Sequence, residues 1–130
     1  MAEMMHVLCV DDEPDILEVV QLVLENMGGL KVSCANGGAK ALAWVAETVP
    51  DLILMDVMMP GMDGPTTLGE MQKLPQLAGV PIVFMTARVQ AKEVREYLAL
   101  GADAVISKPF NPMTLSNEIK AIWSKKRGLG

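Results

Sequence analysis

The chain has 130 residues, a formal net charge of −5 and a hydrophobic content of 51 %. This length suits one domain that buries roughly two-thirds of its unfolded surface, and the acidic balance argues against a direct nucleic-acid partner, which would require clustered Lys and Arg. No apolar stretch approaches the ~20 residues that cross a bilayer, and no secretory signal opens the chain, so we expect a cytoplasmic protein without membrane contact.

The first strand is predicted at residues 7–10, an apolar run that Asp11-Asp12 follows directly. Pro14 suits the first turn of a helix. Apolar residues then recur at helical spacing as far as Gly28-Gly29, which ends that helix. Because a short second strand is predicted at residues 31–35, the chain begins with a strand–helix–strand unit.

The middle of the chain repeats this alternation. A second helix is predicted after Gly37-Gly38, and a third strand at residues 52–55 leads into Asp56. The loop at residues 57–64 is dense in Met, Pro and Gly, and Pro65 opens a third helix. The acidic residue Asp56 is therefore expected at the end of a buried strand.

The last part of the chain supplies two more strand–helix pairs. A strand at residues 82–85 leads into Thr86, and a strand at residues 104–107 leads into Lys108. A helix is predicted between them, and a final helix is predicted from Asn111-Pro112. With no linker or repeat, the pattern predicts one doubly wound α/β domain of (βα)5 order that occupies the whole chain.

Continuous apolar runs of this length are typical of parallel strands that helices cover on both faces. The carboxyl ends of parallel strands share one edge of the sheet, and open α/β sheets place their sites there. Four of the predicted strands bring polar residues to this edge: Asp11, Asp12, Asp56, Thr86 and Lys108. Three carboxylates, a hydroxyl and an ammonium in one crevice predict, in outline, a site for Mg²⁺ and a phosphoryl group.

The cysteines and the histidine suggest no second site. Cys9 and Cys34 fall in the first two predicted strands, and we expect both to be small buried hydrophobic residues in a reducing compartment. No CxxC pair or zinc-ligand spacing occurs. His6, the one histidine, is expected to be an ordinary exposed residue at the start of a strand.

Four motifs together closely resemble the receiver domain of bacterial response regulators, of the single-domain type found in chemotaxis. They are Asp11-Asp12-Glu13-Pro14, the segment 51–64 around Asp56, Thr86-Ala87 and Lys108-Pro109-Phe110. The resemblance covers essentially all of residues 1–130, with a core at about 5–126. It implies a flavodoxin-like fold with a five-stranded parallel sheet in the order 2-1-3-4-5, and a cis bond between Lys108 and Pro109.

The same resemblance implies a signalling domain of a two-component system rather than an enzyme. Asp56 is the expected phosphoacceptor, which takes a phosphoryl group from a phosphohistidine on a sensor histidine kinase or a phosphotransfer protein. Lys108 and Thr86 are expected to contact the phosphoryl oxygens. The metal is expected to be Mg²⁺, with Mn²⁺ as a possible substitute, and its expected ligands are Asp11, Asp12, Asp56 and the backbone carbonyl of Met58.

Two positions depart from the family pattern. Many receivers carry an aromatic residue or His three positions before the lysine, where this chain has Val105. Arg88 lies two residues after Thr86, and that position lies near the path of attacking water in the family. By the same resemblance, a downstream protein partner is expected to bind the surface formed by the fourth helix, fifth strand and fifth helix. These elements carry Tyr97, Val105 and Lys125-Lys126-Arg127 here.

Several alternatives remain open at this point. Asp11 and Asp12 suit the capping of the helix that follows them. A phosphohydrolase of the haloacid-dehalogenase type also uses an Asp nucleophile, but it needs an acid two residues later, where Met58 stands. A flavin-binding protein needs a Ser/Thr/Gly-rich phosphate loop in place of Asp-Asp-Glu-Pro. A receiver-like scaffold that is never phosphorylated is disfavoured, because no acceptor or metal residue is missing.

Overall fold

The computed structural model describes residues 5–128. Its strands are β1 (His6–Val10), β2 (Lys31–Ala35), β3 (Leu52–Asp56), β4 (Ile82–Thr86) and β5 (Ala104–Ser107). Its helices are α1 (Pro14–Gly28), α2 (Gly38–Glu47), α3 (Gly64–Met71), α4 (Ala91–Leu100) and α5 (Leu115–Lys126), with a 3-10 turn, η1, at Pro75–Leu77. The strands form one parallel sheet in the order β2-β1-β3-β4-β5, which confirms the predicted fold class and strand order.

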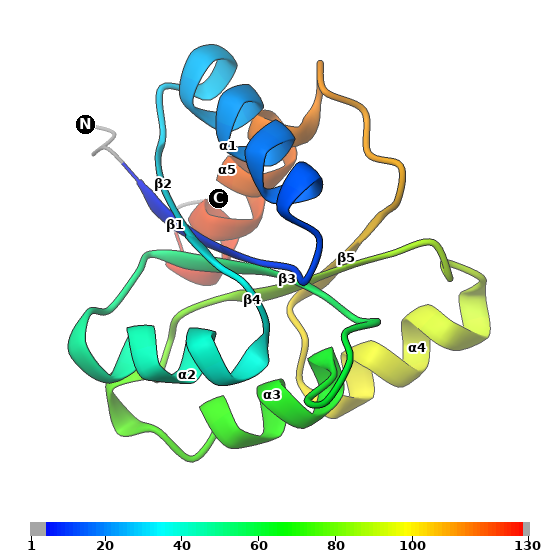
Figure 1. The fold of residues 1–130 in the computed structure, drawn as a ribbon. Helices are drawn as coiled ribbons and strands as arrows, with labels where there is room; N and C mark the ends of the chain where they lie inside the picture. The colour runs from blue at the N-terminus through cyan, green and yellow to red at the C-terminus, as the bar shows by residue number, and fades with distance from the viewer. Residues whose placement is uncertain (1–4, 129–130) are drawn as a thin grey trace.

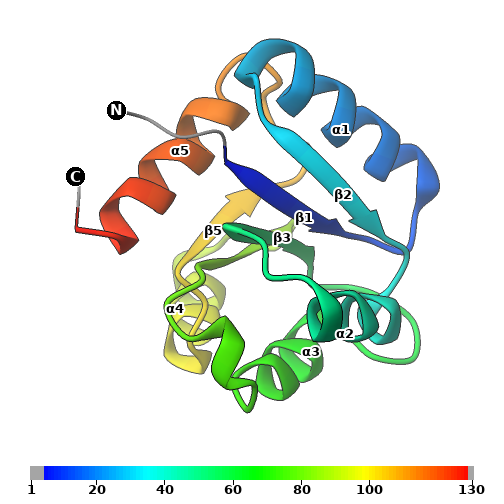
Figure 2. The same cartoon turned by 90° about the vertical axis from the view of Figure 1, so that its left-hand side faces the viewer.

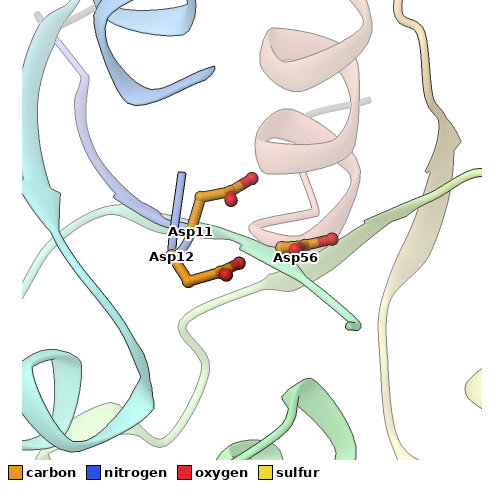
Figure 3. Close-up of side chains that lie close together, drawn as sticks. All are labelled: Asp11, Asp12 and Asp56. Carbon is orange, nitrogen blue, oxygen red and sulfur yellow. The ribbon is translucent and has the colours of Figure 1, made fainter. Parts of the chain in front are cut away.

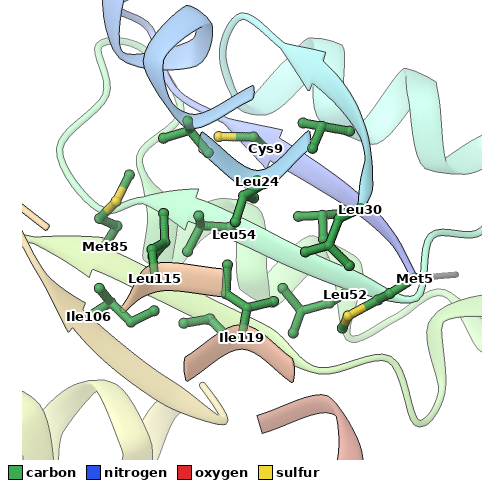
Figure 4. Packing of buried hydrophobic residues seen from close by; sticks show 14 of the residues in the cluster. Met5, Cys9, Leu24, Leu30, Leu52, Leu54, Met85, Ile106, Leu115 and Ile119 are labelled. Carbon is green, nitrogen blue, oxygen red and sulfur yellow. The ribbon is translucent and has the colours of Figure 1, made fainter. Parts of the chain in front are cut away.

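The sheet forms the middle of three layers. Helices α1 and α5 cover one face, and α2, α3 and α4 cover the other (Figures 1 and 2). Successive strand residues point to opposite faces, so Leu54 of β3 packs with Leu24 of α1 and Leu115 of α5 (Figure 4). Its neighbour Met55 joins the cluster on the other face. Since every residue of β3 is buried, this strand forms the centre of the core.

Two aspartates fix the amino ends of the strands. The Oδ2 atom of Asp51 accepts a hydrogen bond from the backbone amide of His6 at 2.7 Å, and that of Asp103 accepts one from Ile82 at 2.8 Å. The other Asp103 oxygen accepts a hydrogen bond from Lys126, which ties the end of α5 to the sheet. These bonds join neighbouring segments at the starts of strands, so they help to hold the carboxyl ends in register.

The final helix begins later than predicted. It starts at Leu115 rather than at Asn111-Pro112. The side chain of Asn111 accepts a hydrogen bond from the amide of Met113 at 2.9 Å, and this local turn competes with helix formation. Residues 112–114 therefore form turns, and the helix is shorter at its amino end.

The cysteine and histidine predictions were partly wrong. Cys9 and Cys34 are register partners on β1 and β2, but only Cys9 is buried. Cys34 is exposed because β2 is an edge strand of the sheet. Its sulfur lies near the Leu17 carbonyl and the Gln21 side chain of α1. His6 is half-buried rather than exposed, since its Nε2 atom lies 2.8 Å from Ser33 Oγ and its ring packs edge-to-face on Trp44. Within residues 5–128, no helix is long and apolar enough to cross a membrane.

His6 gives a pH-dependent prediction. Burial lowers the pKa of His6, Lys31 acts in the same direction and Asp51 opposes them. The folded state then binds this proton less tightly than the unfolded state, so the stability that His6 contributes is present above about pH 6.5 and is lost as the pH falls through the folded pKa. Proton NMR of the single imidazole should give a midpoint below about 6.5. A midpoint above that value would contradict the prediction, and His6→Gln should flatten the fall in unfolding free energy.

Candidate functional site

Three carboxylates meet at the carboxyl edge of the sheet. Asp11 and Asp12 follow β1 directly, and Asp56 is the last residue of the neighbouring strand β3. Each offers an oxygen, and these oxygens all lie within 4.8 Å of one another (Figure 3). Asp11 is 0 % exposed, Asp56 is 3 % exposed and Asp12 is half-buried. The structure therefore brings together the three acidic residues that the sequence placed at strand ends.

Lys108 reaches this cluster from β5, two strands away from β3. Its Nζ atom lies 3.1 Å from Asp11 Oδ2 and 3.3 Å from Asp56 Oδ1, and its side chain is 18 % exposed. Its backbone amide donates a 2.8 Å hydrogen bond to the carbonyl of Thr86, which anchors the residue at the end of β4. The bond between Lys108 and Pro109 is cis, as expected. One ammonium thus faces two buried carboxylates.

Asp11 does not cap α1 itself but accepts a hydrogen bond from the residue that does occupy the N-cap position. Asp11 Oδ1 accepts a 2.9 Å hydrogen bond from the amide of Glu13, which is the residue at the N-cap position of α1. Glu13 itself makes no side-chain cap bond. Asp11 thus closes the turn just before the helix while its second oxygen contacts Lys108. Its two oxygens have two separate partners, and the turn fixes the direction of the carboxylate.

The carboxylates of Asp11 and Asp56 repel each other. Burial raises the pKa of Asp56, and the negative charge of Asp11 raises it further. The Lys108 ammonium and the Met58 amide oppose that rise without cancelling it. For Lys108, burial alone would lower the pKa, but its contacts with Asp11 and Asp56 raise it overall. Three carboxylates against one ammonium leave excess negative charge, which a divalent cation would neutralise.

The donor set fits Mg²⁺. Carboxylate and carbonyl oxygens are the ligands that this ion prefers, whereas Zn²⁺ favours imidazole and thiolate. Met58 is 64 % exposed, and its backbone lies where it lowers the pKa of Asp56. The apolar side chain at this position is therefore compatible with a role for its backbone alone.

Thr86 and Val105 lie at the β4–β5 side of the site. Thr86 is buried, and its hydroxyl oxygen accepts a 3.1 Å hydrogen bond from the amide of Arg88. Val105 is the register partner of Phe84 and joins the same cluster as Tyr97, whose ring packs edge-to-face on Phe84 at 5.5 Å. The position at which many receivers carry an aromatic residue is thus occupied by the short aliphatic side chain of Val105, beside the Phe84–Tyr97 pair.

Gly64 is a site residue that the sequence marked only as the end of a loop. A Cβ atom added there would lie 2.7 Å from the backbone oxygen of Asp56 and 2.9 Å from Cα of Val57. The first turn of α3 therefore packs directly on the backbone that carries Asp56. The sequence did contain a signal for this close contact. Gly64 stands between the helix-capping Asp63 and Pro65, so a residue without a side chain begins the helix.

The comparison with known families decides the identity. The family model for the response regulator receiver domain matches residues 7–120. The chain belongs to the response regulator receiver family. Receiver domains are signalling domains of two-component systems with a phosphoacceptor role, and the acidic pocket of such domains binds Mg²⁺. The resemblance drawn from the sequence motifs is confirmed.

Individual relatives agree with this assignment. Response regulator Rre1 of Synechocystis sp. is 34 % identical over 127 residues, which cover 98 % of this chain and 55 % of that protein. The DNA-binding response regulator MtrA of Mycolicibacterium smegmatis is 37 % identical over 116 residues, which cover 89 % of this chain and 49 % of that protein. The receiver chain thus spans about half the length of these curated relatives.

Solved receiver structures have the same fold. The chemotaxis response regulator CheY4 of Vibrio cholerae superposes with a TM-score of 0.86 at 32 % identity, covering 92 % of this chain and 99 % of that one. A CheY-like receiver protein of Methanospirillum hungatei superposes with a TM-score of 0.85 at 30 % identity, covering 98 % and 100 %. None of these relatives is named as a phosphohydrolase, so the comparisons lend no support to the haloacid-dehalogenase alternative.

Proposed function

We propose that Asp56 is the phosphoacceptor of this receiver and that residues 1–130 form a single switch domain. The observation that carries the proposal is a buried carboxylate, Asp56, that has two further carboxylates within 4.8 Å. The Lys108 ammonium contacts Asp56 at 3.3 Å and Asp11 at 3.1 Å. Such a site can present an anionic nucleophile to a phosphoryl group while fixed positive charge faces the phosphoryl oxygens.

The residues divide the work of phosphoryl transfer. An Asp56 oxygen attacks phosphorus, the bond from phosphorus to the donor histidine nitrogen breaks, and its electron pair returns to the imidazole. Lys108 holds a charge beside the phosphoryl oxygens, and Thr86 offers a hydroxyl proton to one of them. Asp11 orients Lys108 through their 3.1 Å contact.

The same residues would hold the metal. Asp12 and Asp56 would bind Mg²⁺ directly, Asp11 would bind it through water, and Met58 would contribute its carbonyl oxygen, with Mn²⁺ as a substitute. A bound divalent cation would supply charge neutralisation of the phosphoryl oxygens. The fit rests on the all-oxygen donor set and on the excess negative charge that raises the pKa of Asp56.

The proposed partners are proteins. The donor is a sensor histidine kinase or a phosphotransfer protein, and the target binds the surface formed by α4, β5 and α5. MtrA is named as a DNA-binding regulator. We propose that residues 1–130 make no direct contact with DNA, because their net charge of −5 disfavours binding to a phosphate backbone. We also propose that the switch works in the cytoplasm.

Intact-mass measurement after incubation with acetyl phosphate tests the function. The wild-type chain should gain one phosphoryl mass with Mg²⁺ and none with a chelator. Asp56→Asn should abolish the gain, because an amide oxygen is a far weaker nucleophile than a carboxylate. Asp15→Asn is the matched control, since Asp15 is exposed in the first turn of α1 and should leave the gain unchanged. Retained modification of the Asp56→Asn variant would overturn the assignment.

A further inference from the structure

Arg88 connects the site to α4 through two different groups. Its backbone amide donates to the buried hydroxyl oxygen of Thr86 at 3.1 Å, so the start of the β4–α4 loop (residues 87–90) is attached to the site. Its guanidinium points elsewhere, with Nη1 3.6 Å from Glu93 Oε2 in the first turn of α4. The Arg88 side chain is 66 % exposed, so this ion pair is weak and exchangeable.

Glu93 also has two partners. Its Oε2 atom faces Arg88, while Oε1 accepts a 3.3 Å hydrogen bond from the amide of Gln90 at the N-cap of α4. No residue of α4 is fully buried, so little core packing fixes this helix. The bonds that Glu93 makes to the loop therefore help to set the position of the first turn.

A phosphoryl group on Asp56 would change the balance of charge around the loop. It adds a charge of roughly −1.5 to −2 and three acceptor oxygens to a site that already carries excess negative charge. Lys108 is already shared between Asp11 and Asp56. A guanidinium binds phosphoryl oxygens more strongly than it binds an exposed carboxylate. The loop and Glu93 line an open surface pocket of about 520 Å³, so no core packing holds the Arg88 side chain in place.

We propose that the Arg88–Glu93 ion pair is a switch that phosphorylation opens: Arg88 leaves Glu93 and pairs with the phosphoryl oxygens on Asp56. This inference rests on the proposed function and adds how the signal reaches α4. No covalent step is involved, and the guanidinium keeps its proton throughout. Once Arg88 has turned, the first turn of α4 loses its ionic attachment to the loop and can move.

The aliphatic side chain of Val105 favours such a route. A short aliphatic side chain has no ring that could turn between a buried and an exposed position, and the neighbouring Phe84–Tyr97 pair already fills the cluster behind it. An exchange of ionic partners needs no aromatic residue at this position. The signal then passes through Thr86, the loop and Glu93 rather than through the core of the domain.

Thermodynamic linkage makes the proposal measurable with beryllofluoride, which mimics the phosphoryl group, in the presence of Mg²⁺. Arg88→Gln should weaken beryllofluoride binding about tenfold, because the bound anion loses a charge-assisted partner. Glu93→Gln should strengthen it about threefold, because the competing carboxylate is gone. In the double variant Arg88→Gln with Glu93→Gln, the gain from Glu93→Gln should disappear.

Titration followed by backbone amide NMR supplies the readouts. Amide shifts at residues 87–94 should accompany beryllofluoride binding in the wild type and shrink in Arg88→Gln. Arg95→Gln, an exposed change on the same helix, is the control and should leave affinity unchanged. If the wild type does not bind beryllofluoride, the proposed function fails. If it binds and the two substitutions act independently, or Glu93→Gln weakens binding, the ion-pair exchange alone is refuted.

Discussion

Replacing Lys108 by Met should lower the free energy of unfolding by about 2–3 kcal/mol in the absence of divalent cations. The substitution removes the ammonium that contacts Asp11 and Asp56, and it leaves two buried carboxylates facing each other. Loss of one partner from a fully buried ion pair costs about 3–5 kcal/mol, and the partial exposure of Lys108 reduces that figure. Urea denaturation with a chelator present measures the change.

Lys126→Met is the matched control for this experiment. Lys126 forms an even shorter ion pair, 2.8 Å from Asp103, but its side chain is 37 % exposed. Its loss should cost less than about 1 kcal/mol. Added Mg²⁺ should restore part of the stability lost in Lys108→Met, since a cation can enter the same cluster. Equal losses in the two variants would show that Lys108 neutralises no buried charge.

Gly64→Ala should destabilise the domain by about 3 kcal/mol and also reduce phosphorylation of Asp56. The new Cβ atom would lie 2.7 Å from the backbone oxygen of Asp56 and 2.9 Å from Cα of Val57, and backbone atoms cannot turn aside as a flexible side chain can. Such overpacking costs typically about 1–3 kcal/mol. Relief of the clash must move either α3 or the strand end that carries the acceptor. Urea denaturation and intact mass after acetyl phosphate treatment measure the two effects.

Gly69→Ala provides the opposite expectation within the same helix. Gly69 lies inside α3, and nothing lies within 4 Å of a Cβ atom added there. Alanine is favoured over glycine in a helix interior by roughly 0.8–1.0 kcal/mol, so this variant should be more stable than the wild type. Destabilisation of similar size at both positions would mean that any side chain added to α3, rather than contact with the backbone of Asp56 and Val57, sets the cost at Gly64.

The sequence was sufficient for the order of the elements and for the edge of the sheet that carries the site. The apolar run that ends in Asp56 predicts a buried strand and also places Asp56 at its carboxyl end. The local pattern alone was therefore enough to locate this residue at the edge of the sheet. The start of α5 was misplaced because a side-chain bond of Asn111 opposes the helix that Pro112 otherwise favours.

Features that depend on distant neighbours could not be predicted in this way. Cysteine is a residue type that is usually buried, so the sequence favoured a core position for Cys34. It is exposed because β2 lies at the edge of the sheet. The closeness of Gly64 to the Asp56 backbone requires α3 to be docked on β3. The contact of Arg88 with Glu93 depends on the shape of a loop, which composition does not determine.

The contact between Asp11 and Lys108 joins residues that lie 97 positions apart in the chain. During synthesis on a ribosome, the three carboxylates emerge long before the lysine that faces them. A nascent chain from which β5 has not yet emerged contains the proposed nucleophile, Asp56, but lacks the Lys108 ammonium that contacts it. The proposed phosphoacceptor site can therefore be completed only when the last strand joins the sheet, so its assembly depends on synthesis of nearly the whole domain.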